Sequence, residues 1–436
     1  MTRARALAYC SIFIAAVSVA AGCGSGSNPA PPPTITSITV SCAAPSVPEG
    51  QTNQCSANVQ GTGNFSTAVT WNASAGTVSA SGLFTAPNAA GPVTVTATSA
   101  ADGTKSGSAT VMVPPEQKSG FTYRGITHVS WQANEYNTGS GTASQDALAA
   151  TGATWAGVLV TWYQDNATAT SITAESNTPS DAAVIAAITE LHNKNVKVML
   201  KPHVDGADGS WRGTFQPTDV NAWFASFTTF ITHYAQLAKD NNVEMLCFGT
   251  EFVQLSKANL TNWTNVISAI RAIYTGPLAY AANATYGTDE FTSIVFWSQV
   301  DVIGLDAYFP LTNQDDPTVA QLVAAWSLNK DGNNWVAAVQ NFAGAHPGQP
   351  VIFTEIGYRS IAGANKAPYD WSFSGPADDT EQQNCYEATY EVWSQNATVM
   401  QGNFWWDWSV SPPVVATDTD YTPWNKPAQT VLQNWQ

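Results

Sequence analysis

Two glutamates occupy equivalent places in two similar stretches of the sequence. The stretch VEMLCFGTEF contains Glu251, and the later stretch PVIFTEIGYRS contains Glu355. Each glutamate follows a threonine at the end of an apolar run with the composition of a buried β-strand. Two carboxyl groups that face one substrate bond can share acid–base work, because one can give a proton while the other stays ionised. The repeated pattern therefore makes these glutamates a candidate catalytic pair.

Hydrolysis of a glycosidic bond needs such a pair. In enzymes that retain configuration, one carboxylic acid protonates the leaving oxygen, and a carboxylate about 5–5.5 Å away attacks the anomeric carbon. Repulsion by an ionised Glu355 would favour the protonated form of Glu251. Esterification of Glu355 by the sugar would remove that repulsion and let Glu251 act as a base. Either glutamate alone fits a salt-bridge or capping role equally well, so the interpretation depends on both lying at one site.

The composition favours a neutral partner. Among 436 residues, 32 are acidic and 16 are basic, which gives a formal net charge of −16. This excess of negative charge repels nucleic acid and anionic membrane surfaces, so we expect no nucleic-acid partner. Aromatic residues are as frequent as charged ones, at 11% each, which indicates surfaces that make contacts through rings. Net charge alone does not separate this interpretation from an ordinary exported protein.

The start of the chain has the composition of an export signal. Two arginines precede an apolar run that ends in AAGC at Cys23, and this ending resembles a bacterial lipobox. We expect residues 1–23 to be a lipoprotein signal peptide, with a lipid on Cys23 anchoring the protein to a membrane, and residues 24–33 to be a tether. An ordinary signal peptide with a chance cysteine is the alternative. Glycine rather than aspartate follows Cys23, which favours the outer membrane or cell surface.

The other cysteines of the expected mature chain have two kinds of surroundings. Cys42 and Cys55 lie close together in a β-rich segment and could pair in an oxidising compartment. Cys247 and Cys385 lie in apolar surroundings, so we interpret them as small buried hydrophobic residues. No CxxC motif occurs and the five histidines are scattered, which gives a structural zinc site little support.

The chain divides into two parts of different texture. From 34 to 114, seven short alternating runs are separated by Gly, Asn, Ser and Pro, which predicts a small all-β sandwich. Residues 115–120 have the composition of a linker. From 121 to 436, eight apolar strand candidates alternate with helical segments, which predicts a (β/α)8 barrel of the α/β class. Helices are clearest after Ser180 and near Thr218, where apolar residues recur at spacings of three and four. A doubly wound sheet is the alternative, but no Gly-rich dinucleotide fingerprint follows the first strand.

A barrel would bring the two glutamates to one mouth. The carboxyl ends of its strands converge there, and Glu251 and Glu355 end the fourth and seventh strands. Polar and aromatic residues at the other strand ends and in the following loops would stack on sugar rings and bond their hydroxyl groups. These candidate substrate-binding residues are Trp131, Trp162, Tyr163, Lys201, His203, Asp205, Trp211, Arg212, Thr250, Asn283, Asp306, Tyr308, Tyr358, Trp406 and Asp407.

The basic members of this set have a possible second role. Lys201, His203 and Arg212 could hold Glu355 ionised. His203 and Asp205 could instead bind a metal, but two ligands without a partner motif do not define a metal site.

Several motifs are similar to those of a known family. KPHVD, DGSWRG, CFGTEF, VIGLDAYFP, FTEIGYRS and FWWDWS, spread over residues 121–436, resemble glycoside hydrolase family 113 of clan A, best known for β-1,4-mannanases. The resemblance implies a retaining double displacement without a cofactor, with Glu251 as acid/base and Glu355 as nucleophile. One position departs from the wider clan, in which most members place Asn directly before the acid/base to bond the sugar 2-hydroxyl. This chain has Thr250 there, so substrate detail does not transfer from the clan at large.

The first domain resembles a different family. Its run SAGTVSASGLFTAPNAAGPVTVTATS is similar to bacterial immunoglobulin-like domains of group 2. No cluster of ionisable side chains occurs there, so we interpret it as a spacer or a weak adhesion module.

Together these features predict a monomeric, exported bacterial lipoprotein that cleaves β-1,4-mannan within the polysaccharide chain. One alternative is the same mechanism on another β-linked glycan, such as xylan or glucan. Another is a surface glycan-binding protein with an inactive barrel, and a third is adhesion through the first domain. The sequence does not fix the sugar, the linkage, or the endo or exo mode.

Overall fold

The structure is a computed structural model that describes residues 32–89, 91–113, 119–284, 290–414 and 417–436. The expected signal peptide, Cys23, nearly all of the tether and most of the 115–120 linker lie outside the described residues. The chain forms two compact units that divide after residue 115. Within the described ranges, every helix is too short or too polar to cross a lipid bilayer.

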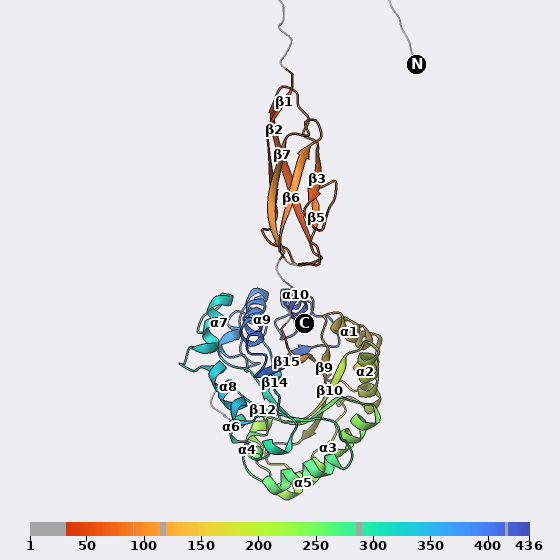
Figure 1. Ribbon diagram of the computed structural model, residues 1–436. Coiled ribbons are helices and arrows are strands. Elements are labelled where there is room, and N and C mark those ends of the chain that lie inside the picture. Colours follow the sequence, from red (N-terminus) through yellow and green to blue (C-terminus); the bar gives the residue numbers. More distant parts are fainter. Residues whose placement is uncertain (1–31, 90, 114–118, 285–289, 415–416) are drawn as a thin grey trace, which may run out of the picture. The chain divides into compact units, whose positions relative to one another are not determined.

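The first unit is a sandwich of two antiparallel sheets (Figure 1). One sheet has the order β1-β2-β5-β4 and the other has the order β3-β6-β7. Alternation along β6 buries Val93, Val95 and Ala97 while their neighbours point outward, which is the pattern of a strand with one face on a core. This confirms the predicted sandwich. Its strands are β1 Thr34–Cys42, β2 Thr52–Thr62, β3 Val69–Ala73, β4 Thr77–Val78, β5 Leu83–Thr85, β6 Gly91–Ser99 and β7 Ser106–Val113.

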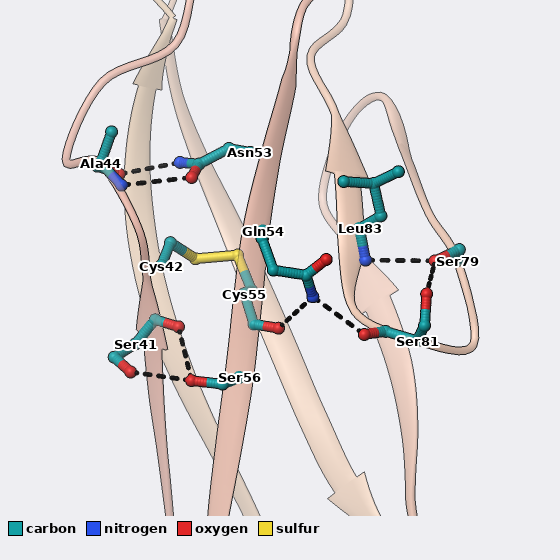
Figure 2. The surroundings of a disulfide bond; sticks show 10 residues. All are labelled: Ser41, Cys42, Ala44, Asn53, Gln54, Cys55, Ser56, Ser79, Ser81 and Leu83. Carbon is teal, nitrogen blue, oxygen red and sulfur yellow. Dashed lines mark hydrogen bonds between the residues drawn. A yellow bond between two sulfur atoms is a disulfide. The ribbon is translucent and has the colours of Figure 1, made fainter.

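A disulfide joins the first two strands of this unit. Cys42 and Cys55 lie directly opposite each other in the β1–β2 ladder, and their sulfurs are bonded (Figure 2). On one side of the bridge, the Asn53 amide exchanges hydrogen bonds with the backbone of Ala44, at 2.8 and 3.2 Å. On the other side, Gln54 Nε2 donates to the carbonyl oxygens of Cys55 and Ser81. The bridge therefore sits within a continuous set of backbone contacts rather than at a frayed edge.

The second unit is a closed barrel of eight parallel strands surrounded by helices (Figure 1). Neighbouring strands follow chain order, and β15 pairs with β8 to close the ring. This confirms the (β/α)8 barrel and excludes the doubly wound sheet. The strands are β8 Tyr123–His128, β9 Trp155–Gln164, β10 Lys197–Gly206, β11 Met245–Thr250, β12 Leu278–Asn283, β13 Val302–Asp306, β14 Val351–Ile356 and β15 Met400–Trp408.

The longer helices bury apolar residues against the barrel, as α3 does with Trp223, Phe227 and Ile231. The Ser180 hydroxyl caps α2 by accepting from the Ala183 backbone N–H, at the residue predicted to begin it. The cap of α3 is Asp219, one residue after the predicted Thr218. The α-helices are α1 Gly139–Ala149, α2 Asp181–Asn193, α3 Val220–Asp240, α4 Val253–Ser256, α5 Leu260–Arg271, α6 Glu290–Ser293, α7 Val319–Ser327, α8 Trp335–Ala345, α9 Asp379–Ser394 and α10 Pro427–Trp435, and the 3-10 helices are η1 Glu135–Asn137, η2 Arg212–Thr214, η3 Trp297–Gln299 and η4 Ala364–Lys366.

The inside of the barrel changes from apolar to polar toward the carboxyl ends of its strands. An apolar cluster with members from β9 to β15, among them Met199, Cys247 and Ala281, fills the lower interior. Because side chains alternate along a strand, the next inward positions carry on from these residues. On β10, Met199 is followed on the same face by Lys201 and His203. Strand alternation therefore delivers polar side chains to the mouth above a closed apolar floor.

Candidate active site

Irregular strand pairing precedes both glutamates. The β11–β12 pairing shifts register between Cys247 and Thr250. In the β13–β14 pairing, Asp306 lies opposite Glu355 after a shift that leaves one extra residue on β14. Bulges of this kind re-aim a side chain and are frequent beside active sites. They turn the two carboxyl groups into the mouth from strands three places apart in the ring.

Glu355 is surrounded by hydrogen-bond donors and positive charge. Lys201 Nζ donates to its Oε1, and His203 Nε2 lies 3.7 Å from the same oxygen. Tyr308 donates its hydroxyl proton to Oε2 at 2.8 Å. The carboxyl group is buried, with 5% of the residue exposed. A buried carboxyl group held at both oxygens by an ammonium group and a hydroxyl donor is fixed in orientation.

Lys201 is shared between two carboxyl groups. Its ammonium group lies 3.4 Å from Asp306 Oδ1 as well as touching Glu355. Burial opposes its charge, but Asp306 and Glu355 together raise the pKa of Lys201 above its usual value. Burial and the charge of Glu355 raise the pKa of Asp306 well above its usual range, and Thr354 donates to it at 2.7 Å. The lysine therefore stays charged beside Glu355.

Glu251 has a different set of partners. Asn283 Nδ2 donates to Oε1 at 2.6 Å, and the indole N–H of Trp211 donates to Oε2 at 3.0 Å. Arg212 Nη1 lies 3.5 Å from Oε2. The backbone of Glu251 has φ 52°, a left-handed conformation that costs a non-glycine residue about 1–3 kcal/mol. Such strain persists where the surrounding structure holds it, which is typical of functional positions.

Arg212 links the two halves of the site. Its Nε and Nη2 atoms both donate to Asp205 Oδ1, at 3.0 and 2.5 Å. Burial opposes its charge, but Asp205 and Glu251, with a smaller part from Glu355, raise the pKa of the guanidinium. Both glutamates therefore lie within electrostatic reach of one side chain. Its direct partners are Asp205 and Glu251, and Glu355 acts on it only through charge.

His203 is neutral and available for a ligand. Burial, together with the positive charges of Arg212 and Lys201, lowers its pKa well below the usual value. Its ring lies parallel to the indole of Trp406, with centroids 6.3 Å apart. Among the described residues, neither ring nitrogen makes a hydrogen bond, and the same holds for the buried Thr250 hydroxyl. Buried polar groups without partners are costly, so these atoms fit a site completed by substrate hydroxyl groups.

The remaining candidates at the mouth differ in how far they are buried. Trp131 and Trp211 are 42% and 40% exposed. The Tyr163 hydroxyl accepts from Asn177 at 2.9 Å. The pKa of Asp407 is raised to about 8 by burial and by the nearby charges of Asp420 and Asp418, against the opposing effect of Lys426.

Two predicted binding residues lie elsewhere. Trp162 points outward from β9, where its indole N–H donates to Tyr234 on α3 at 2.8 Å and its ring packs on Phe230. Tyr358 is fully buried in the core between strands and helices, and Gln382 on α9 donates to its carbonyl oxygen. Both side chains belong to the packing of helices on strands rather than to the mouth. Across the described segments, no group of three or more His, Cys, Asp or Glu side chains could hold a metal ion.

Glu290 is a supporting residue that sequence analysis missed. This fully buried carboxyl group accepts from Ser256 Oγ at 2.7 Å, from the Tyr280 hydroxyl at 2.8 Å and from the Asn283 backbone N–H at 2.6 Å. It thereby fixes Asn283, which bonds Glu251. Its only sequence signal is an acidic residue shortly after the fifth strand, and the adjacent Asp289 gives the same signal.

Replacing Glu290 by glutamine should change how stability depends on pH. Burial raises its pKa to about 7 from an ordinary value of 4.5, so its stabilising effect is complete below pH 4.5 and is lost as pH rises through 7. Glutamine stays neutral and can turn its oxygen toward the Asn283 N–H. The parent protein should lose this stabilisation as pH rises, whereas the variant should not. The unfolding free energy of the variant minus that of the parent protein should therefore increase by about 3 kcal/mol between pH 4.5 and pH 8. Urea denaturation at both values measures this, and an equal difference at both would contradict it.

A parallel eight-stranded barrel with two partnered glutamates at its mouth, from the fourth and seventh strands, defines a class of glycoside hydrolases. The sequence profile of Glycoside Hydrolase Family 113 matches residues 126–426, and the chain belongs to this family. The profile of the Bacterial Ig-like domain (group 2) matches residues 34–111. Both matches confirm the resemblances found in the sequence motifs.

Three of the similar solved structures are described as members of the same family. One is the GH113 β-mannanase AaManA from Alicyclobacillus acidocaldarius in complex with ManMIm, at 26% identity and a TM-score of 0.62, covering 72% of this chain and 96% of that one. A second, described as a GH113 β-1,4-mannanase, has 25% identity, a TM-score of 0.62 and coverage of 71% and 96%. A third of the same description, at 24% identity and a TM-score of 0.62, covers 72% and 97% and shares the fold. No curated protein sequence matches the chain.

Proposed function

We propose that the protein hydrolyses β-1,4-mannan by a retaining double displacement, with Glu355 as nucleophile and Glu251 as acid/base. The observation that carries the proposal is the division of partners between the two glutamates. Lys201 and Tyr308 each bond one oxygen of Glu355 and fix its orientation, whereas Asn283 and Trp211 bond the two oxygens of Glu251. Membership of family 113, and the β-1,4-mannanases among the similar structures, support mannan as the substrate.

In the first step, a Glu355 oxygen attacks the anomeric carbon while Glu251 gives its proton to the glycosidic oxygen. The bond between the anomeric carbon and that oxygen breaks, and the sugar remains as an ester of Glu355. Ester formation removes the negative charge of Glu355. Lys201 still lies 3.4 Å from Asp306. Loss of the Glu355 charge removes one of the effects that raise the pKa of Asp306, so Asp306 can ionise more easily and balance the buried ammonium group.

In the second step, Glu251 takes a proton from water, and the water oxygen attacks the anomeric carbon. The ester bond breaks and returns Glu355 to its carboxylate form. Arg212 is held by Asp205 throughout, so its charge remains balanced while Glu251 is protonated and is in place when Glu251 ionises. Two attacks from opposite faces leave the product with the configuration of the substrate.

Sugar recognition follows from the polar atoms without partners. The His203 ring nitrogens and the Thr250 hydroxyl bond to no described residue. His203 Nε2 lies 3.7 Å from Glu355, and Thr250 directly precedes Glu251 in the chain. A mannosyl ring has an axial 2-hydroxyl, which reaches a different position from the equatorial hydroxyl of glucose. We assign Thr250 as a partner of a sugar hydroxyl, in the position where most clan members carry Asn.

A panel of soluble polysaccharides tests this function. Purified protein is incubated with β-mannan, xylan and mixed-linkage β-glucan, and released reducing sugar is measured. We expect release from mannan, with NMR of the first product showing the β-anomer. Release of sugar from xylan or glucan alone would show that mannan is not the substrate but would leave the proposed mechanism unchanged. Binding without release from any of the three would make the protein a glycan-binding module.

We also propose that Cys23 anchors the enzyme to the outer membrane or cell surface. The proposal rests on the lipobox-like AAGC sequence and the following tether. Membrane fractionation of producing cells tests it, since Cys23→Ala should move the protein from the membrane to the soluble fraction. Equal distribution of both forms would contradict an anchor at Cys23.

A further inference from the structure

Strongly exposed aromatic side chains gather on one face of the barrel. Within the described residues there are four: Trp131 at 42%, Trp211 at 40%, Tyr369 at 47% and Trp371 at 78%. Each lies in a segment that follows the carboxyl end of a strand, after β8, β10 or β14. All four therefore belong to the loops on the catalytic face. The site already described accounts for Trp211 through its bond to Glu251, but it does not account for Tyr369 and Trp371.

The segment that carries Tyr369 and Trp371 is connected to the nucleophile. Tyr421 donates its hydroxyl proton to the Pro368 carbonyl oxygen at 2.7 Å. The ring of Tyr421 lies 6.2 Å from the ring of Tyr308, centroid to centroid, and Tyr308 bonds Glu355. Two buried tyrosines thus separate the exposed segment from the catalytic carboxylate.

The backbone of this segment is held in place. Arg359 Nη1 donates to the carbonyl oxygens of Trp371 and Phe373, at 2.9 and 2.6 Å. Asp370 accepts from the backbone N–H and the hydroxyl of Ser372, at 2.9 and 2.6 Å. Phe373 packs against the main core. All the bonds made by Trp371 use its backbone, and its side chain has no ring contact or hydrogen bond with the described residues.

A large aromatic ring on a fixed backbone has no internal role here. The indole contributes no packing to the fold at 78% exposure, and an exposed apolar surface of this kind marks a contact site. Because the backbone is already ordered, a ligand that stacks on the ring has little loop entropy to overcome. The faces of β-linked pyranose rings that carry axial C–H groups are apolar and flat, so they match an indole.

The positions of the strands around the mouth show how a bound glycan could reach Trp371. In the ring of strands, β10 and β14 are four places apart, so Trp211 and Trp371 follow strands on opposite sides of the mouth. Glu251 is bonded to Trp211, and Glu355 is linked to the Trp371 segment through Tyr308 and Tyr421. A glycan that crosses the mouth over the two carboxyl groups would pass from one tryptophan toward the other.

We propose that Trp371, with Tyr369 beside it, forms a distal sugar-binding subsite that holds the polysaccharide beyond the sugars flanking the cleaved bond. The proposal rests on the proposed function, since it needs a β-linked glycan in the mouth. It assigns these residues a role in selecting long chains over short ones. The chemistry of bond cleavage does not involve them.

Chain-length dependence tests the subsite. We compare Trp371→Ala with the parent protein on polymer, on hexasaccharide and on an aryl glycoside that fills only the central positions. For Trp371→Ala we expect kcat/KM to fall about tenfold on the two long substrates, mainly through KM, as for the loss of one stacking contact. On the aryl glycoside the change should be less than about twofold. Trp371→Tyr keeps a flat ring and is the matched control, expected to recover most of the loss.

A binding assay separates this inference from the proposed function. Glu355→Ala, with and without Trp371→Ala, is run on native gels that contain mannan, xylan or β-glucan. In a gel whose polysaccharide slows the migration of Glu355→Ala, we expect the double variant with Trp371→Ala to be slowed less. Identical migration of the two in all three gels, or equal kinetic losses on long and short substrates, would overturn the subsite. Failure of the proposed function would be seen in a different measurement, because the parent protein would then release no sugar from any of the polysaccharides.

Thermal unfolding tests whether Trp371 supports the fold rather than binding a ligand. Because the indole is exposed, Trp371→Ala should unfold at the same temperature as the parent protein. A large fall would show that the side chain supports the fold and would count against a binding role.

Discussion

Replacing Glu355 with alanine should reduce turnover of mannan by roughly ten-thousand-fold or more, the scale that accompanies loss of a nucleophile. The variant has no oxygen to form the glycosyl ester, and Lys201 and Tyr308 are left facing an empty space. A small anion such as azide fits the charge and size of that space. With an activated aryl β-mannoside, we expect azide to restore activity and to yield the α-glycosyl azide. In that reaction azide bonds to the anomeric carbon as the aryl oxygen leaves, with a single inversion.

The matched control for this experiment is Glu355→Gln. Its side chain fills the same space without a nucleophilic oxygen, so it should be as inactive as the alanine variant but not respond to azide. Azide products are identified by NMR of the anomeric proton. A β-glycosyl azide from Glu355→Ala, or turnover close to that of the parent protein, would show that another residue is the nucleophile.

Replacing Glu251 with alanine should give a loss that depends on the leaving group. General acid catalysis contributes about 10²–10⁴-fold, so hydrolysis of mannan, with its poor leaving group, should fall by that amount. An aryl mannoside with an acidic phenol leaves without protonation, so its first step should continue and the glycosyl ester should accumulate. A burst of phenol followed by slow turnover is the expected time course. Azide should then give the β-glycosyl azide, because it attacks the ester after the first inversion.

Stopped-flow absorbance of the released phenol measures the burst directly. Its amplitude should equal the enzyme concentration, since one ester forms for each active site. Equal losses on mannan and on the activated substrate, with no burst, would mean that Glu251 is not the proton donor. Opposite configurations of the azide products from the two variants would identify the two roles independently of any rate.

Much of the barrel could be predicted because its strands are strongly apolar and alternate with helical segments. All eight predicted strands exist, although their ends differ by a few residues. The stretch VIGLDAYFP forms a strand only over Val302–Asp306. Hydropathy marks where a chain is buried, whereas the ends of a strand depend on where its hydrogen-bonded partners stop.

Strand alternation explains which of the predicted residues lie near Glu355. Lys201 and His203 lie at alternate positions on β10, and both reach Glu355. Strand alternation also explains why Trp162 does not lie at the mouth, where we predicted it. Trp155 belongs to the interior cluster, so alternation along β9 puts Thr161 and Tyr163 on the inner face and turns Trp162 toward α3.

Residues that support the site from loops were beyond sequence analysis. Tyr421 comes from the segment after the last strand, and Glu290 begins a single-turn helix. Neither stands at a regular spacing, so nothing in the local pattern separates them from ordinary polar residues. Their roles arise from contacts between distant parts of the chain, which hydropathy and spacing do not describe.

The left-handed backbone at Glu251 sets stability against function at a single position. Glycine adopts φ 52° without steric cost, so Glu251→Gly would relieve local strain while removing the proposed acid/base. Selection for thermal resistance alone would therefore favour discarding a residue that the proposed mechanism requires. Engineering of this enzyme for heat tolerance has to screen every improved variant for hydrolysis as well.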